Sequence, residues 1–539
     1  MFNWRNTYLF SIAVRFFLAL TNSYIHPDEH FQNFEVLTSS ILNYTTSIPW
    51  EFTSENPARS MGPLYLIYGP ILYLIRITGS TFTPLQIWYI MRLQFLVLTW
   101  IFTDFLVYRM LPTRPERIKG IFFISTSYVT LTYQQHCFSN SIETILVLLA
   151  VYLVDEMRFF TNEHRRTLVS SYFVLGSVVA LGIFNRITFP AFLILPSVFV
   201  FNHLRYSNHK LKAISMGCLG FLIPSISFIV LDSIYFGHEN TGMSILQDPF
   251  GDFSKYIITP WNSLKYNSST QNLAKHGIHP YYTHLLVNFP QMVGPTGLMF
   301  LFYKGNKYLR ATPFLSLVSG LIFLSTVPHQ ELRFLIPLVP LACCCFDLEK
   351  FQPVIVEKNG TSKKTSSMLV SALMFLWYVF NIILSILMGV LHQGGVIPVL
   401  DHFHTSPSLL TNDGTSAQIW WRTYSPPNWI LGNKDNTLSI VISTSEAPIP
   451  VDLDGKRSQL LIDTMGSDFD YVQGLAKDLQ VLGVSKIYLI TPVASYLTTV
   501  SEPEKYRNVW NYTLHLDLDH LDFGNLKSLT PGIGVYEIL

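Results

Sequence analysis

A cluster of ionisable residues at positions 26–32, with the sequence His-Pro-Asp-Glu-His-Phe-Gln, is the clearest chemical signal in the chain. It follows the apolar run 9–20. Ionisable groups at the edge of a membrane are costly to place there, so they indicate a functional site. Pro27 suits the first position of a helix, so both carboxylates are predicted in a positively polarised first turn. This arrangement favours a carboxylate that accepts a proton. The alternative is that Asp28 and Glu29 only cap a surface helix.

Further polar residues occur in segments that are distant from this cluster in the sequence. Histidine and arginine in such segments suit a reaction in which a nucleophile loses a proton and an anionic leaving group is stabilised. The candidates are Arg59, Arg186, Lys265, His279, His329, Glu331 and Arg333. A structural alternative exists for two of them, because Arg186 can pair with Glu143, and Arg333 with Glu331, to neutralise buried charge.

A metal site at His26 and His30 is a further alternative. Two histidines four residues apart can face one side of a helix and bind one metal ion. Pro27 disturbs that turn, however, and neither a cysteine nor a third histidine cluster accompanies the pair. We therefore expect no metal and no other cofactor.

The composition places these residues in a membrane protein. Of the 539 residues, 49% are hydrophobic and only 13% are charged. Soluble domains carry about twice this share of charged residues. The sequence therefore predicts a polytopic α-helical membrane protein, and its net charge of +1 gives no indication of nucleic-acid binding. Arg15 interrupts the first apolar run and no cleavage site precedes His26, so we expect a retained span there and not a signal peptide.

Apolar stretches that are long enough, or nearly long enough, to cross a bilayer predict about eleven spans, with a range of 10–13. They lie at 7–24, 86–108, 119–135, 140–156, 168–184, 187–201, 211–232, 284–303, 311–327, 332–347 and 367–391. The segment 61–77 is also apolar but is broken by Pro63, Gly69 and Pro70.

Basic residues then set the orientation. The loops rich in lysine and arginine share one side of the membrane only if 61–77 does not cross it. These loops are 109–119, 158–166, 205–212, 304–310 and 350–364. We therefore predict that 61–77 is re-entrant or interfacial, that the N-terminus is cytosolic, and that the opposite side is the lumen of the endoplasmic reticulum. The luminal regions are 25–85, 233–283, 328–331 and 392–539.

Glycosylation sequons agree with this orientation. The sequons at Asn43, Asn267 and Asn511 lie on the predicted luminal side, and the one at Asn359 lies on the other side. We expect glycans on Asn43 and Asn511.

Two domains are predicted, a multi-spanning catalytic domain over 1–391 and a small luminal α/β domain over 392–539. In the second domain, alternating or continuous apolar runs indicate strands, and a 3.6-residue period indicates a helix. The strands are expected at 438–443, 459–462 and 486–490, and the helix at 469–482. No catalytic motif is visible in this domain.

Several motifs together resemble the mannosyltransferases that use dolichyl phosphate mannose, which form glycosyltransferase family 22 and have the membrane GT-C fold. The resemblance covers about residues 7–347 in order. It is carried by 26–32, Arg59-Ser60, Thr259-Pro260-Trp261-Asn262 with Tyr266-Asn267, and 329–334. The blocks 276–280, 283–291 and 421–427 are most similar to the subgroup that adds the fourth mannose of GPI anchors. One departure is Leu332, where that subgroup is expected to have proline.

The resemblance implies transfer of mannose from dolichyl phosphate mannose to the 2-hydroxyl of the third mannose of a GPI precursor, forming an α-1,2 linkage. A β-linked donor giving an α product requires inversion, hence one displacement and one general base. Asp28 is then the expected base, with Glu29 as a second catalytic carboxylate and His30 as a residue that orients the acceptor or tunes the base. Arg333 and His329 are expected to bind the leaving phosphate. Further substrate contacts are expected from His26, Gln32, Arg59, Arg186, Lys265, His279 and Glu331.

Other functions are compatible with the same residues. The chain could be the third GPI mannosyltransferase or an N-glycan α-mannosyltransferase, whose motifs overlap with these. A proton-coupled transporter that uses Asp28 and Glu29 as a relay is disfavoured, because few charged groups lie in mid-span and no inverted repeat is visible. A non-catalytic subunit of a GPI-processing complex would not need the carboxylates.

Overall fold

The computed structural model describes the chain except for a set of short segments. These are 1–3, 80, 160–164, 238–240, 275–276, 352–353, 357–361, 365–367, 407–408, 410–414, 435–436 and 449–458. The chain forms two compact units, each assembled from separate stretches of sequence. Unit 1 contains Met1–Phe16, Trp50–Ile67 and Gln94–Ile383, and unit 2 contains Phe17–Pro49, Tyr68–Leu93 and Leu384–Leu539. The predicted domain boundary at residue 392 stays a prediction.

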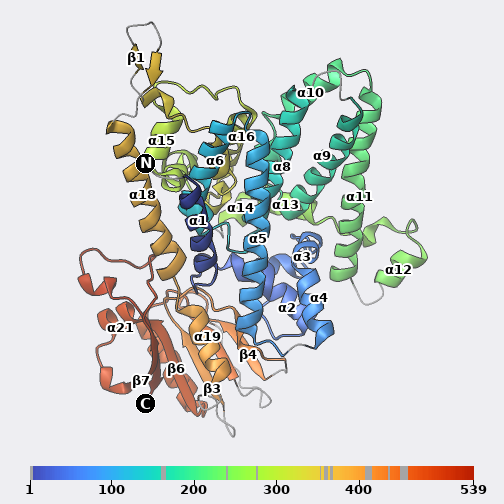
Figure 1. Ribbon diagram of the computed structural model, residues 1–539. Helices are drawn as coiled ribbons and strands as arrows, with labels where there is room; N and C mark the ends of the chain where they lie inside the picture. The colour runs from blue at the N-terminus through green and yellow to red at the C-terminus, as the bar shows by residue number, and fades with distance from the viewer. Residues whose placement is uncertain are drawn as a thin grey trace. The chain divides into compact units, whose positions relative to one another are not determined.

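Unit 1 is built almost entirely from helices (Figure 1). It contains parts of α1 (Trp4–Ala19), α5 (Pro84–Met110) and α18 (Met368–Ile386). Its other helices are α3 (Gly62–Ile67), α6 (Arg114–Thr126), α7 (Tyr128–Leu131), α8 (Ser139–Phe159), α9 (Arg165–Asn185), α10 (Ser197–Tyr206), α11 (Lys210–Phe236), α12 (Thr241–Gln247), α13 (Thr259–Asn267), α14 (Thr270–Ala274), α15 (Phe289–Phe302), α16 (Thr312–Ser325) and α17 (Leu338–Cys344).

Within the described part of the chain, four helices are long and apolar enough to cross a membrane. They are Pro84–Met110, Lys210–Phe236, His284–Phe302 and Met368–Leu391. Several other predicted spans are shorter or interrupted in the structure. In 187–201, for example, a 3-10 turn at Phe189–Phe192 precedes α10, because Pro190 and Pro196 prevent one continuous helix. The count of eleven crossings therefore stays a prediction.

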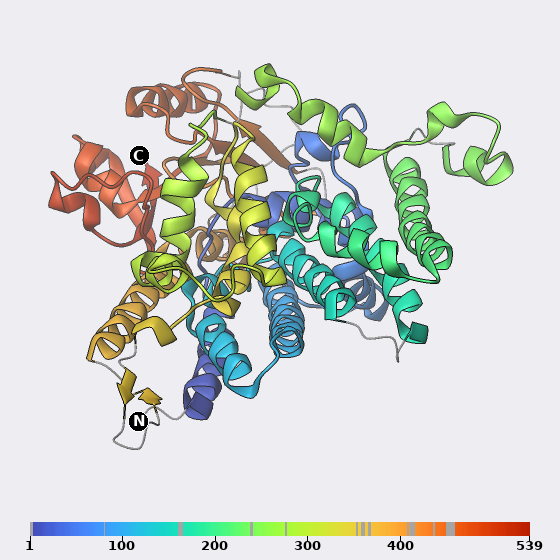
Figure 2. The same ribbon diagram turned by 90° about the horizontal axis from the view of Figure 1, so that it is seen from above.

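Helices α9 and α11 lie side by side, and their backbones are in close contact (Figures 1 and 2). A Cβ atom on Gly176 would lie 2.1 Å from the Gly217 carbonyl oxygen, and one on Gly220 would lie 2.0 Å from the Phe173 carbonyl oxygen. The Ser177 hydroxyl also donates a hydrogen bond to the Gly220 carbonyl, at 3.0 Å. Small residues that let helix backbones approach closely are characteristic of helix pairs in membranes.

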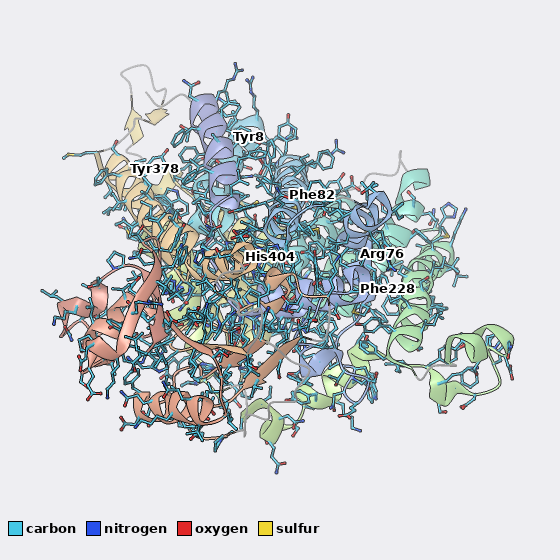
Figure 3. All side chains as sticks on the ribbon, turned by 90° about the horizontal axis from the view of Figure 1, so that it is seen from below. Tyr8, Arg76, Phe82, Phe228, Tyr378 and His404 are labelled. Atoms are coloured by element: carbon cyan, nitrogen blue, oxygen red, sulfur yellow. The ribbon has the colours of Figure 1, made fainter. Side chains whose placement is uncertain are left out.

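The predicted re-entrant segment 61–77 is not one helix in the structure. It is divided at Tyr68 into α3 and α4 (Gly69–Thr78), and the break falls where Gly69 and Pro70 follow each other. In unit 1, α3 packs against α11, because Gly62 leaves room for the ring of Phe228, which Figure 3 labels. The re-entrant or interfacial placement of this segment stays a prediction.

Unit 2 contains a six-stranded mixed sheet with the strand order β4-β5-β3-β6-β8-β7. The strands are β3 (Ser416–Trp420), β4 (Leu438–Ile442), β5 (Gln459–Asp463), β6 (Lys486–Pro492), β7 (Tyr506–Tyr512) and β8 (Ile533–Ile538). The first four strands in this spatial order, β4, β5, β3 and β6, are parallel to one another. Strand β8 is antiparallel to both of its neighbours, β6 and β7. The helix α20 (Phe469–Val481) packs on the sheet through Val472, Leu475 and Leu479, which are spaced for one helical face.

The three strands and the helix predicted in this region are confirmed within two residues at each end. The N-terminal segments of unit 2 add α2 (Glu35–Leu42) and α4. The C-terminal segment also adds α19 (Val396–Thr405), which packs against the 3-10 turn η11 (Asn428–Leu431). His404, labelled in Figure 3, donates from Nδ1 to the Leu431 carbonyl at 2.9 Å and so fixes that turn.

Candidate functional site

The acidic segment of unit 2 forms a helix start, as the sequence predicts. Pro27 lies in a turn, Asp28 and Glu29 are the first helical residues, and a π-helical turn follows over His30–Phe34 before α2 begins. A π-helical turn holds one extra residue and occurs often at functional sites. The first-turn position of both carboxylates is therefore confirmed.

Asp28 is the accessible carboxylate of the two. Its backbone N–H donates to His26 Nδ1 at 3.2 Å, so the His26 ring caps the helix start. The same Nδ1 lies 3.6 Å from Asp28 Oδ1, but a nitrogen that accepts the backbone hydrogen bond cannot also carry a proton for an ion pair. We therefore interpret this contact as a cap made by a neutral ring. The side chains of His26 and Asp28 are 35% and 20% exposed.

Glu29 is buried and paired. Its Oε1 lies 3.9 Å from Arg92 Nε, and both side chains are fully buried. Arg92 also donates to the Thr21 carbonyl at 2.7 Å and lies over the ring of Trp88, with its guanidinium carbon 4.7 Å from the ring centre. Glu29 therefore lies in the interior beside an arginine, and its predicted catalytic role stays a prediction. Sequence reasoning missed Arg92, although a lone arginine inside the apolar stretch 86–108 is a signal that could have found it.

His30 lies in a closed aromatic surrounding. It is fully buried, and its Nδ1 accepts a hydrogen bond from the Trp429 indole N–H at 3.2 Å. Its ring stacks on Trp88 with 6.1 Å between ring centres. The side chain of Gln32 is also mostly buried. In this structure the buried side chain of His30 supports the helix start through its contacts with Trp88 and Trp429. Its predicted contact with substrate stays a prediction.

Glu35 is a buried carboxyl group that sequence reasoning missed. Its Oε1 accepts a hydrogen bond from the Trp429 backbone N–H at 3.4 Å, and the residue is fully buried. Burial raises the pKa of Glu35 to about 8, so its neutral form is favoured at neutral pH. Trp429 therefore contacts both His30 and Glu35, which lie five residues apart on the π-helical segment and α2.

Three of the predicted arginines gather in unit 1, each beside a carboxylate. Arg59 Nε donates to Glu51 Oε2 at 2.8 Å, Arg186 Nε lies 3.5 Å from Glu143 Oε2, and Arg333 Nε donates to Glu331 Oε2.

Shared contacts link these three arginines. Arg59 and Arg186 both donate to the Ser139 hydroxyl, at 3.5 and 3.0 Å. Arg186 and Arg333 both lie near the ring of Phe334, at 4.9 and 5.6 Å from its centre. We call Arg59, Arg186 and Arg333 the arginine cluster.

His329 joins the arginine cluster through one carboxylate, and His279 lies beside it. Glu331 contacts Arg333, and its Oε1 accepts from His329 Nε2 at 2.7 Å. Burial lowers the pKa of His329, but the hydrogen bond and the charge of Glu331 outweigh this effect, and the net pKa is raised. The His279 ring lies 6.0 Å from that of His329, and its Nδ1 accepts from the Gln330 backbone N–H at 3.3 Å. The loops that carry His279 and His329 therefore lie close together in unit 1.

Lys265 is exposed on α13, and the hydrogen bonds and ion pairs found among the described residues do not link it to the arginine cluster. The start of α13 is anchored by Asp232, at the end of α11, which sequence reasoning missed. Asp232 accepts from the Thr259 hydroxyl at 2.8 Å and from the Met61 backbone N–H at 2.9 Å. Asp232 therefore connects the loop that carries Arg59 to α11 and α13. His276, part of the motif 276–280, lies outside the described residues.

Among the described residues, no group of three or more histidine, cysteine, aspartate or glutamate side chains is arranged to hold a metal ion. The expectation that the reaction needs no metal stays a prediction, which is tested by experiment below.

Comparison with known proteins gives a family match over most of the chain. The model of the Alg9-like mannosyltransferase family matches residues 6–431. "GPI mannosyltransferase 4" of Debaryomyces hansenii is 52% identical, over 100% of this chain and 99% of that protein. "GPI mannosyltransferase 4" of Saccharomyces cerevisiae is 37% identical, over 98% and 97%. Among solved structures, ArnT from Cupriavidus metallidurans bound to undecaprenyl phosphate aligns over 99% of this chain and 98% of that chain, with 10% identity and a TM-score of 0.49.

Proposed function

Since this chain belongs to the Alg9-like mannosyltransferase family and is therefore a glycosyltransferase, we propose that it adds the fourth mannose to a GPI-anchor precursor. The observation that carries this proposal is the similarity, end to end, to proteins named GPI mannosyltransferase 4. The donor is dolichyl phosphate mannose and the acceptor hydroxyl is the 2-hydroxyl of the third mannose. The enzyme works in the endoplasmic reticulum membrane with a luminal active site, a cytosolic N-terminus and the GT-C fold that its motifs imply.

The general base is Asp28. An inverting displacement needs one group that accepts the proton of the attacking hydroxyl. Asp28 is partly exposed at a helix N-terminus, where the helix dipole stabilises its anionic form. Glu29 is buried against Arg92, and a proton accepted there would leave the arginine as an unpaired buried charge. The two adjacent carboxylates thus have separate roles, with Asp28 as the base and Glu29 as the residue that keeps the helix start in place.

The leaving group is dolichyl phosphate, which is an anion and needs positive charge and hydrogen-bond donors more than a general acid. Arg333 and His329 supply these groups. Glu331 contacts both, which fixes two cationic side chains on one short loop and favours the protonated form of His329. Arginine also offers a planar pair of donors that matches phosphate oxygens. Arg186, Arg59 and His279 extend this basic surrounding within unit 1.

Mass analysis of lipid-linked GPI intermediates in cells that lack this protein tests the proposal. We expect a precursor with three mannoses to accumulate, and expression of the wild-type chain to restore the four-mannose form. Accumulation of a two-mannose precursor would instead identify the third GPI mannosyltransferase. Normal GPI intermediates with truncated N-glycans would identify an N-glycan enzyme, and either result would overturn the proposal.

A further inference from the structure

The acidic segment of unit 2 is held in place by residues from the C-terminal part of the chain. The Tyr24 backbone N–H donates to the His392 carbonyl at 3.1 Å, and the Thr45 backbone N–H donates to the Asn433 carbonyl at 2.7 Å. All four residues belong to unit 2. The segment that carries the proposed base is therefore fixed at both of its ends by residues nearly 400 positions later in the sequence.

Tyr424 lies beside the first of these contacts, next to Tyr24 and His392. Its ring is 6.3 Å from the ring of His26 and 5.6 Å from that of Tyr24, measured between ring centres. Its hydroxyl is 3.2 Å from His392 Nε2, and its backbone N–H donates to Gln393 Oε1 at 3.3 Å. Tyr424 thus touches the ring that caps Asp28 on one side and a pair of buried residues on the other.

The buried pair, His392 and Gln393, is itself anchored to residues near the C-terminal end of the chain. Gln393 has a φ of 48°, a left-handed conformation that is unfavourable for a residue with a side chain. Its side-chain amide donates to Asp517 Oδ1 at 3.2 Å and its backbone N–H donates to the Leu516 carbonyl at 3.1 Å, which hold that conformation. Burial lowers the pKa of His392, so its ring is neutral and can accept the Tyr424 O–H hydrogen bond.

We propose that Tyr424 is a positioning residue for the proposed base, because it holds the His26 ring against the backbone N–H of Asp28. This gives the C-terminal segment a part in the reaction: it fixes the start of the acidic helix. The inference rests on the proposed function, in which Asp28 is the base. It agrees with the family match, which extends through the C-terminal residues up to 431 and so includes Tyr424.

The test compares mannose transfer by purified full-length variants in lipid nanodiscs, with dolichyl phosphate mannose as donor and a three-mannose GPI precursor as acceptor. Tyr424→Phe keeps the ring beside His26 but loses the hydrogen bond to His392, so we expect kcat to fall about fivefold. Tyr424→Leu also loses the ring contact, and misplacement of a reacting group by about 1 Å reduces rates by about 10²-fold. The matched control is Tyr471→Phe, which removes a 2.6 Å hydroxyl contact to Ser443 elsewhere in unit 2 and should leave kcat unchanged.

A double-mutant comparison separates positioning from general loss of structure. If Tyr424 acts through Asp28, then Tyr424→Leu should cost almost nothing further in an Asp28→Asn background. An equal fold loss in both backgrounds would show a merely structural effect and overturn the inference, as would wild-type kcat in both Tyr424 variants. If the wild-type protein itself transfers no mannose to this acceptor, the proposed function fails, which is a different result.

Discussion

At the scale of single residues, the two neighbouring carboxylates of the acidic segment lie in different surroundings. Asp28 and Glu29 are adjacent and chemically alike, and both were expected in a first helical turn. In the structure Glu29 is fully buried beside Arg92, which is more than 60 positions away in the sequence, whereas Asp28 is partly exposed. His30 and Glu35 likewise acquire their surroundings from Trp429. No local pattern could predict these contacts, because each depends on the tertiary fold.

The pKa of Glu35 leads to a prediction about stability and pH. In the folded protein this pKa is about 8, whereas the usual value is 4.5. Between these values the folded protein keeps a proton that the unfolded chain has lost, so stability falls as pH rises, by at most about 1.4 kcal/mol per pH unit. Glu35→Gln removes this dependence because glutamine does not titrate. Melting temperatures in detergent from pH 5 to 8 should therefore fall in the wild type relative to Glu35→Gln. Parallel profiles would contradict the buried neutral carboxyl.

Arg333 gives a second prediction at this scale. If its planar guanidinium binds the leaving phosphate, lysine cannot replace it, although the charge is kept. Arg333→Lys should lose most activity, and Arg333→Ala should also weaken binding of dolichyl phosphate, measured by transfer rates and by lipid binding in nanodiscs. An Arg333→Lys enzyme with normal kinetics would remove Arg333 from the site.

In the proposed site, side chains alone stabilise the leaving phosphate. EDTA should therefore not change the transfer rate. Strong inhibition by EDTA that Mn²⁺ or Mg²⁺ reverses would show that a metal is needed after all.

At the scale of elements, the periodicity of apolar residues correctly predicted the regular strands and the regular helix of the C-terminal region. The strands β4, β5 and β6 and the helix α20 were predicted almost to their ends, because each buries one face in a regular pattern. Interrupted helices were predicted less well. A hydropathy window averages over Pro190 and Pro196, whereas in the structure both prolines lie where the helical segments are interrupted.

The contact between α9 and α11 gives a prediction that compares two glycines on one helix. Gly220→Ala would place a Cβ atom 2.0 Å from the Phe173 carbonyl oxygen, so the helices must separate, at a cost of about 1–3 kcal/mol. At Gly217 the nearest atom to the added Cβ is 3.7 Å away, an ordinary contact, so Gly217→Ala is the matched control. Melting temperatures in detergent should fall for Gly220→Ala alone. Equal stability of the two variants would contradict the close backbone approach.

At the scale of the whole molecule, each of the two compact units is assembled from separate stretches of the chain. Unit 2 combines the C-terminal sheet with two N-terminal stretches, including the one that carries Asp28. A change in composition along the sequence marks where the apolar helices end, but it cannot show that distant stretches fold together. The family itself was predictable from the motifs at 26–32 and 329–334, and the family match confirms it.

The orientation in the membrane can be checked through glycosylation. Asn43 and Asn511 are both exposed in the structure, and both lie in regions predicted to be luminal. We expect glycans on these two residues and none on Asn359, which lies outside the described residues and in a predicted cytosolic loop. Endoglycosidase shifts of variants that keep a single sequon measure this. A glycan on Asn359 would overturn the eleven-crossing topology.

The most direct test of the central claim is the rate of mannose transfer by Asp28→Asn in nanodiscs, with dolichyl phosphate mannose and a three-mannose GPI precursor as substrates. Loss of a general base should reduce the rate by about 10²–10⁴-fold, while expression, melting temperature and donor binding stay close to the wild type. Glu29→Gln is the neighbouring comparison and should instead lower the melting temperature, because it breaks the buried pair with Arg92. Production of the four-mannose product by Asp28→Asn at the wild-type rate would contradict the assignment of Asp28 as the base.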